Sequence, residues 1–276
     1  MDNQITIGQA LWWAIEKFKR NQIESAQIDA ELLLCRVLGT TREVLYMTSE
    51  NELEEEKYFL FEKLVAQRLM RVPVAYILQE KYFFGLKFVV NENVLIPRPE
   101  TEELVISSLE QINNITAEKK EINILEIGTG SGAVIVSLAQ ALEKTHLKDR
   151  VNFFASDKSS LALDVAKINI ERHNLTERIF LFHSDLLKEI PEYIKFEIIV
   201  ANLPYLDRTK IEEYSPEIKY EPSMALFAEE KGKKIYYDLF AEIKAKKLEP
   251  IVIAECSQDQ EKELKIAYDN LITIGV

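Results

Sequence analysis

The sequence predicts an α/β fold in which a small N-terminal helical bundle precedes a doubly wound, mostly parallel sheet. Residues 99–276 alternate short apolar runs with segments of helical periodicity, which is typical of an open sheet with helices on both faces. Residues 1–72 instead carry apolar side chains at helical spacing throughout, which is typical of a bundle. The 276 residues are enough for two domains.

The first 72 residues are expected to fold as four helices suited to docking a partner. Thr6 and Ser25 can cap the first two helices, and Gly39 would end the second. A short third helix contains Leu45, and the fourth runs from Leu53 to Met70. The residues expected to face inward include Leu11, Trp12, Ile15 and Phe18 in the first helix and Phe59, Leu60, Leu64 and Leu69 in the fourth.

Residues 73–98 are expected to form a β-hairpin that links the two domains in an ordered way. The segment is rich in aromatic and β-branched residues, with Gly85 near its middle. A helix is expected to start near Glu100, directly after a loop in which two prolines bracket Arg98.

The remaining residues are expected to alternate strands and helices. The continuous apolar run at 122–128 is typical of a strand that is buried on both faces. The expected strands are 122–128, 151–157, 178–185, 196–205, 250–256 and a last one at the end of the chain. The expected helices are 131–143, 160–173, 233–246 and one near Gln260.

A glycine-rich turn follows the first of these strands and opens a helix. It contains Gly128, Thr129, Gly130, Ser131 and Gly132. Glycines let backbone N–H groups approach a ligand closely, and Asp157 after the next strand can accept hydrogen bonds from both hydroxyls of a ribose. The pattern predicts a nucleoside site, and by itself it fits both a nicotinamide cofactor and S-adenosyl-L-methionine (SAM).

The tetrapeptide Asn202-Leu203-Pro204-Tyr205 stands at the end of the fourth expected strand, beside the predicted nucleoside site. The Asn202 side-chain oxygen and the carbonyl of Leu203 or Pro204 can each accept one N–H of a planar NH2 group. Held in this way, an amide or ring-attached nitrogen can direct its lone pair at an electrophilic methyl group, and the same acceptors stabilise the charge that develops on it. Tyr205 would pack on the planar substrate. The tetrapeptide therefore favours N-methylation with SAM as cofactor.

Composition excludes several other classes of protein. The formal charge of −12 argues against a chain that mainly binds the phosphate backbone of nucleic acid. No metal site and no disulfide framework are expected from the few cysteines and histidines, which are Cys35, Cys256, His146, His173 and His183. The N-terminus lacks the features of a signal peptide and no run is long enough to span a membrane, so a cytoplasmic location is expected.

The glycine turn, the tetrapeptide and the segment IPRPETEELV at 96–105 together resemble the bacterial protein-(glutamine-N5) methyltransferase family. Members of this class I SAM-dependent family modify the glutamine of the GGQ motif in peptide chain release factors. The resemblance extends to residues 71–88 and 220–232, and it covers nearly the whole chain. It implies a monomeric enzyme that acts on peptide chain release factors 1 and 2 and holds them with its N-terminal helical domain.

The resemblance also implies roles for individual residues. Residues 128–132 and Asp157 would bind the methionine and ribose of SAM, and Asp185 with Leu186 would lie near its adenine. Asn202, Pro204 and Tyr205 would be catalytic, since they orient the glutamine amide. The residues implied in substrate binding are Asn202, Leu203, Pro204, Tyr205, Phe83, Arg98 and Glu100.

The sequence departs from the family pattern at four places. Leu203 replaces a proline, which frees an N–H group and is expected to relax the turn. Leu186 replaces a tryptophan, and Glu126 stands where an aspartate is common. The family's sheet closes with an antiparallel hairpin, whereas this sequence stops at LITIGV, so the last part of the sheet is expected to be missing.

Two other interpretations of the function remain open. Nucleic-acid methyltransferases that act on adenine N6 or other exocyclic amines share the tetrapeptide, but residues 1–75 hold nine Lys or Arg against 12 Asp or Glu, whereas a nucleic-acid-reading domain should be basic. A non-catalytic docking protein on a degenerate SAM fold would fit Leu203, Leu186 and the short C-terminus.

Overall fold

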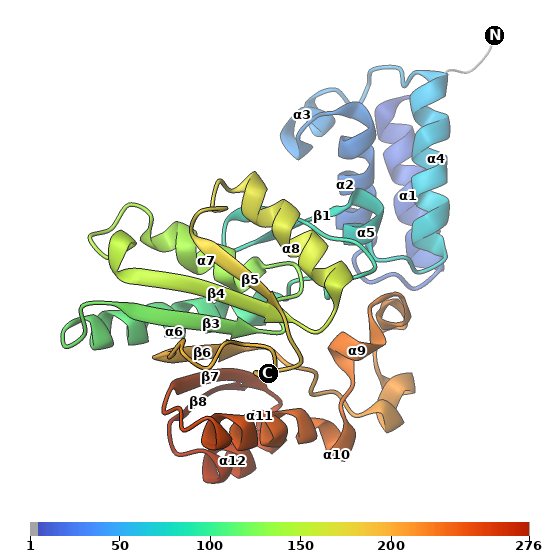
Figure 1. Cartoon of the computed structure of the whole chain (residues 1–276). Coiled ribbons are helices and arrows are strands. Elements are labelled where there is room, and N and C mark those ends of the chain that lie inside the picture. The colour runs from blue at the N-terminus through green and yellow to red at the C-terminus, as the bar shows by residue number, and fades with distance from the viewer. Residues whose placement is uncertain (1–4, 276) are drawn as a thin grey trace. The chain divides into compact units, whose positions relative to one another are not determined.

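The computed structural model describes residues 5–275, except for the side chain of Lys231, and the chain divides into two compact units (Figure 1). The first unit ends at Gln79 and the second begins at Glu80. The segment 73–98, expected as a linking hairpin, is therefore shared: a short helix belongs to the first unit and the hairpin to the second. Pro73 is the N-cap residue of this short helix, so it precedes one helix as well as following another.

The first unit consists of helices, as predicted. They are α1 (Ile7–Arg20), α2 (Ala26–Leu38), α3 (Arg42–Met47), α4 (Glu55–Leu69) and α5 (Val74–Leu78). Thr6 caps α1 in a reciprocal capping box with Gln9, and Gly39 ends α2 in the left-handed conformation. Within residues 5–275, no helix combines the length and apolar character needed to cross a membrane.

Three of the side chains expected to face inward do not. Trp12, Phe59 and Leu60 are 65%, 57% and 47% exposed, whereas Phe61 and Val65 are buried. Because successive helical residues lie about 100° apart, a face assigned one or two residues out of phase points away from the core. The N-terminal unit therefore carries more exposed apolar surface than the sequence predicted.

The second unit is built on a six-stranded sheet with the order β5-β4-β3-β6-β7-β8, in which every neighbouring pair is parallel. The strands are β3 (Ile122–Ile127), β4 (Val151–Asp157), β5 (Ile179–His183), β6 (Ile198–Ala201), β7 (Ile251–Cys256) and β8 (Leu271–Gly275). The doubly wound fold is confirmed. The fourth strand is shorter than predicted and ends at Ala201, so the tetrapeptide lies in the loop that follows it.

Helices pack on both faces of this sheet (Figure 1). Ile122 and Ile124 of β3 face a core shared with α6 (Glu102–Thr116), α7 (Ala133–Leu142) and α8 (Ser160–Arg172). Leu125 and Ile127 alternate onto a second core with α11 (Lys234–Ala245) and α12 (Gln258–Ala267). The remaining short helices are η1 (Pro99–Thr101), η2 (Lys148–Arg150), η3 (Arg208–Glu213), η4 (Pro216–Tyr220), α9 (Ser223–Leu226) and α10 (Glu229–Gly232).

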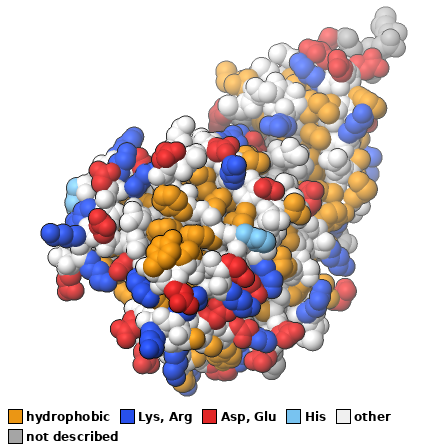
Figure 2. All heavy atoms as spheres, viewed as in Figure 1, with side chains coloured by type: hydrophobic (Ala, Val, Ile, Leu, Met, Phe, Trp, Pro, Cys, Tyr) orange, Lys and Arg blue, Asp and Glu red, His pale blue; other side chains and the backbone are white. Residues whose placement is uncertain are grey.

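An aromatic surface lies over β4 and β5, where Figure 2 shows hydrophobic side chains gathered. The ring of Phe154 stacks on Phe180 and Phe182 at centroid distances of 5.6 and 6.1 Å. Phe154 and Phe180 are direct partners across the two strands. Cross-strand aromatic packing of this kind stabilises the pairing of the edge strand β5.

The predicted hairpin consists of β1 (Glu80–Phe83) and β2 (Leu86–Val89), which pair antiparallel. Phe83 is 2% exposed and packs into the core. The buried Asn169 of α8 anchors the end of the hairpin, because its Oδ1 accepts from the Val89 N–H at 2.7 Å and its Nδ2 donates to the Val89 carbonyl at 2.9 Å. The hairpin is thus fixed to the sheet unit.

Candidate active site

Two cavities adjoin at the carboxyl ends of the strands. The first, of about 170 Å³, is lined by residues that follow β3, β4, β5 and β6. The second, of about 660 Å³, extends past β6 toward β7. Both are lined by Leu95, Arg98, Asn202, Leu203 and Ala225, so these residues form a common wall.

The glycine turn lies in the wall of the first cavity. Its backbone is fixed from below, because the N–H groups of Gly128 and Thr129 donate to the Ser156 carbonyl at 2.8 and 2.9 Å. Gly128 has a φ of +72°, and a Cβ there would lie 3.0 Å from the Leu203 side chain. Gly132, also predicted to bind the ligand, is the N-cap residue of α7 and does not line the cavity. Four of the five predicted residues of the turn, Gly128 to Ser131, therefore line the cavity.

Asp157 lies beside this turn, and its carboxylate accepts hydrogen bonds from the backbone of the turn and of the segment after β4. Its Oδ2 accepts from the Gly130 N–H and its Oδ1 from the Ser159 N–H, both at 2.9 Å. Burial raises the pKa of Asp157, and these hydrogen bonds partly offset that effect. A carboxylate has about four acceptor positions, so two remain for hydroxyl groups in the cavity.

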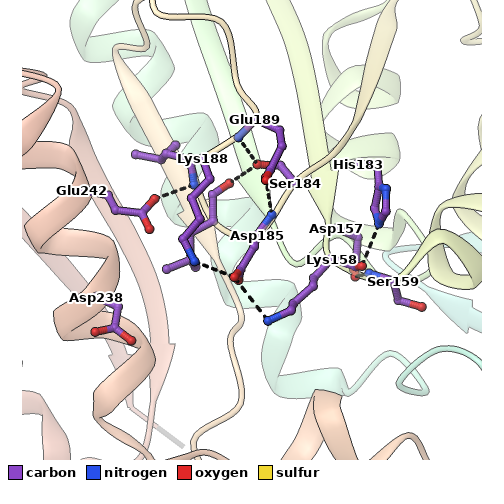
Figure 3. A network of polar contacts seen from close by, with 12 residues as sticks. Asp157, Lys158, Ser159, His183, Ser184, Asp185, Lys188, Glu189, Asp238 and Glu242 are labelled. Atoms are coloured by element: carbon purple, nitrogen blue, oxygen red, sulfur yellow. Dashed lines mark hydrogen bonds and ion pairs between the residues drawn. The ribbon is translucent and has the colours of Figure 1, made fainter.

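Asp185 and Leu186 line the other end of the first cavity. Figure 3 shows that two lysines converge on Asp185: its Oδ2 lies 2.6 Å from the Lys188 Nζ and 3.3 Å from the Lys158 Nζ. The hydrogen bond from Lys188, more than any other interaction, lowers the pKa of Asp185. Leu186 has a φ of +55°, a conformation rare for a residue with a side chain. Asp185 therefore presents an ionised acceptor at this end of the cavity.

Glu126 is an acidic residue of the first cavity that we did not predict as part of the site. Its Oε2 accepts from the Thr129 hydroxyl at 2.6 Å and from the Ile135 N–H at 3.2 Å. Burial raises the pKa of Glu126 to about 8, despite these hydrogen bonds. Its carboxyl group therefore links the glycine turn to the first turn of α7 by hydrogen bonds.

The tetrapeptide forms part of the wall between the cavities. The Nδ2 of Asn202 donates to the Thr101 hydroxyl at 3.0 Å, so the nitrogen of this amide is held by the protein. The Leu203 N–H, which a proline would lack, donates to the buried Tyr236 hydroxyl at 3.2 Å. The freed donor is therefore paired, and the Leu203 side chain is only 3% exposed and lies against Gly128.

The last two tetrapeptide residues lie on opposite sides of that wall. Pro204 lines the first cavity and Tyr205 the second. The Tyr205 hydroxyl donates to the Glu255 Oε1 at 3.0 Å. Burial and the neighbouring Glu255 raise the pKa of Tyr205, so its hydroxyl keeps its proton.

The three remaining predicted residues differ in position. Arg98 lines both cavities and pairs with Glu221, with 2.5 Å between the Arg98 Nη2 and the Glu221 Oε1. Glu100 lines the second cavity. Phe83 lines neither, because its ring packs against Phe88 in the core. The structure therefore does not bring Phe83 to the site.

Two further residues of the site, Thr101 and Glu255, were missed. Thr101 holds Asn202, and Glu255 holds Tyr205. Glu255 could have been found from the sequence, because it is the one charged residue of the apolar strand 250–256. Thr101 belongs to the segment 96–105 that carries the resemblance, but nothing in the sequence indicates its contact with Asn202, which spans 101 residues of chain.

Comparison with known families matches both units. Residues 9–78 match the family described as "PrmC N-terminal domain". Residues 99–205 match "Ribosomal protein L11 methyltransferase (PrmA)", which includes the glycine turn and the tetrapeptide.

Individual relatives match most of the chain. A release factor glutamine methyltransferase of Rhodopirellula baltica is 36% identical over 85% of this chain and 77% of its own length. One of Leptospira interrogans is 40% identical over 78% of this chain and 72% of its own. A bifunctional methyltransferase of Rickettsia conorii is 37% identical over 90% of this chain, which spans 50% of that longer protein.

Proposed function

Because the chain belongs to the release factor glutamine methyltransferase family, we propose that it transfers a methyl group from SAM to the side-chain amide nitrogen (N5) of the glutamine in the GGQ motif of peptide chain release factors 1 and 2. One observation of the structure supports the proposal most directly. Asn202 stands in the wall shared by two cavities with its amide nitrogen bound to Thr101, which leaves its Oδ1 as a hydrogen-bond acceptor.

The first cavity suits SAM. Asp157 keeps acceptor positions for two ribose hydroxyls, and Asp185 offers an ionised acceptor for the amino group of an adenine. Gly128 and Gly130 leave the cavity wall without side chains at their positions. When bound, SAM supplies an electrophilic methyl group, and the turn, Asp157 and Asp185 hold it in place.

The second cavity suits a glutamine side chain. Asn202 would accept one N–H of its amide through Oδ1, and a carbonyl of the adjacent backbone would accept the other. These two acceptors fix the plane of the amide and stabilise positive charge that develops on its nitrogen. Tyr205 offers a flat face in the same cavity. Binding both reactants against one wall supplies the proximity that the reaction needs.

We assign the N-terminal unit to docking of the release factor. The acidic balance of residues 1–75, nine basic against 12 acidic residues, does not suit a nucleic-acid partner. Exposed apolar side chains such as Trp12 and Met47, which are 65% and 84% exposed, suit a protein partner.

The test incubates the protein with methyl-labelled SAM and a purified release factor, with total DNA and ribosomal RNA as parallel substrates. The expected result is label on the release factor that disappears when the GGQ glutamine is replaced. Label on nucleic acid alone would instead establish the exocyclic-amine methyltransferase. Absence of SAM binding in calorimetry would favour a non-catalytic docking protein.

A further inference from the structure

A buried carboxylate that lines neither cavity holds the segment that leads into α6. Glu221, the residue after η4, is 7% exposed. Its Oε2 accepts from the Ile96 N–H at 3.1 Å, and its Oε1 lies 2.5 Å from the Arg98 Nη2. Both oxygens of one side chain are therefore used to hold two neighbouring residues that lie 125 and 123 positions away in the sequence.

The segment 96–101 depends on such an anchor because of its prolines. Pro97 and Pro99 have no N–H group, so residues 96–99 carry only two backbone donors and are poorly suited to pairing in a sheet. Each proline ring also fixes φ at its own position, which makes the segment stiff. A stiff segment that is held at one end restrains the residues at its other end.

The other end of this segment holds the tetrapeptide. The Thr101 N–H donates to the Arg98 carbonyl at 3.1 Å, and the buried Thr101 hydroxyl accepts from the Asn202 Nδ2 at 3.0 Å. The segment 96–101 thus connects Glu221 to the Asn202 amide through hydrogen bonds and a short stretch of backbone.

The segment that carries Glu221 is itself bound to the residues after the tetrapeptide. The Leu226 carbonyl accepts from the Leu206 N–H at 3.0 Å. The segments 202–206, 221–226 and 96–101 therefore hold one another in a closed ring of contacts. Residues of all three segments line the first cavity, so the ring borders that cavity, and Glu221 links two of its three parts.

We propose that Glu221 is a positioning residue: by holding the segment 96–101 it fixes the Thr101 hydroxyl and, through this hydroxyl, the Asn202 amide. The catalytic consequence rests on the proposed function, but the restraint on Asn202 is a property of the protein alone. Without Glu221, Asn202 would spend less time in the orientation in which its Oδ1 accepts from a substrate amide, and the rate of transfer would fall.

The first test uses Glu221→Gln, which keeps the size of the side chain but offers one acceptor oxygen to two donors. Its matched control is Glu213→Gln, which changes an exposed glutamate at the end of η3 and should keep the wild-type kcat. We expect Glu221→Gln to lower kcat about tenfold to a hundredfold, as for a displaced positioning group, with SAM affinity in calorimetry within about threefold. In a Thr101→Val background the further loss should be under about twofold, because the effect acts through that hydroxyl.

A second measurement does not depend on activity. The side-chain NH2 resonances of Asn202, assigned by their absence in Asn202→Ala, should shift and exchange faster with water in Glu221→Gln and stay unchanged in Glu213→Gln. If Glu221→Gln does not fold, Arg98→Met removes one of the two contacts at a partly exposed side chain and should alter the same resonances.

Unchanged Asn202 resonances in the folded variants would overturn the proposal. An unchanged kcat in Glu221→Gln, or losses in the double variant that add in free energy, would also overturn it. A wild-type protein that labels no release factor would refute the proposed function, and the resonances would still decide the role of Glu221.

Discussion

Replacing Gly232 by alanine should disable the site from a distance. Gly232, at the end of α10, has a φ of +85°, and a Cβ there would lie 2.0 Å from the Tyr205 carbonyl oxygen and 2.6 Å from the Gln260 Nε2. Ordinary contact begins near 3.4 Å, so the Tyr205 carbonyl would have to move by about 1.4 Å. The movement would also break the 3.1 Å hydrogen bond that Gln260 donates to this carbonyl.

The effect on activity follows from that displacement. A shift of about 1 Å in a positioning group can lower the rate about 100-fold, so we expect Gly232→Ala to lower kcat by about that factor. Gly232→Ala should also lower the free energy of unfolding, because backbone strain and overpacking cost about 1–3 kcal/mol each.

The assay compares methyl transfer to a release factor, SAM affinity by calorimetry and thermal unfolding. Gly85→Ala is the matched control, because Gly85 has a similar φ of +71° but a Cβ added there would have no atom within 4 Å, so this variant should show the strain alone and keep full activity. A folded Gly232→Ala protein with transfer within about twofold of wild type would refute the claim that this contact holds the tetrapeptide.

The remaining predictions concern four residues of the same unit. Asn202→Ala should lower turnover by about 100-fold or more, with unchanged SAM affinity in calorimetry; an unchanged rate with labelled SAM would remove Asn202 from the mechanism. Asp157→Asn should weaken SAM binding about tenfold to a hundredfold, since its NH2 group cannot accept hydrogen bonds; calorimetry at constant pH measures this, and equal affinity would contradict the assignment. Burial raises the pKa of Glu126 to about 8. Its contribution to the free energy of unfolding is therefore fully present below the ordinary carboxyl pKa near 4.5, and it is lost as the pH rises through 8. Between about pH 5 and pH 8 the free energy of unfolding of wild type should therefore fall more than that of Glu126→Gln, by at most about 5 kcal/mol. Denaturant titrations at several pH values measure this. If the two proteins show parallel curves of unfolding free energy against pH, Glu126 does not titrate in this range. Asn169→Ala should lower the free energy of unfolding by about 3 kcal/mol or more, because the Val89 N–H and carbonyl and the Ser131 carbonyl lose their partner; thermal unfolding like that of wild type would argue against this anchor.

The sheet could be predicted from the sequence because each buried strand is a short apolar run between turn signals. The strand predicted at 151–157 has those bounds in the structure, and that at 122–128 differs by one residue. Positions that follow such strands converge at one edge of a parallel sheet, which is why Asp157 and Asn202 could be placed near one site. Helix faces were less certain, as Trp12 shows, because a small error in phase turns a side chain outward.

Contacts between distant segments could not be predicted. The partner of the Leu203 N–H is Tyr236, which lies 33 residues further along the chain. The sequence shows that replacing a proline frees a donor, but a donor is destabilising only when it lacks an acceptor. The position of Phe83 could not be predicted for a different reason. An aromatic residue in a hairpin can face a ligand or the core, and only the packing of β1 decides which.

The common wall of the two cavities has a kinetic consequence. Asn202 and Leu203 border both cavities. In the proposed function, the methyl donor and the acceptor are therefore bound at the same time on either side of these two residues. Direct transfer of this kind needs no methylated form of the enzyme between two half-reactions. Double-reciprocal plots of initial rate, taken at several fixed concentrations of the second substrate, should intersect and not run parallel.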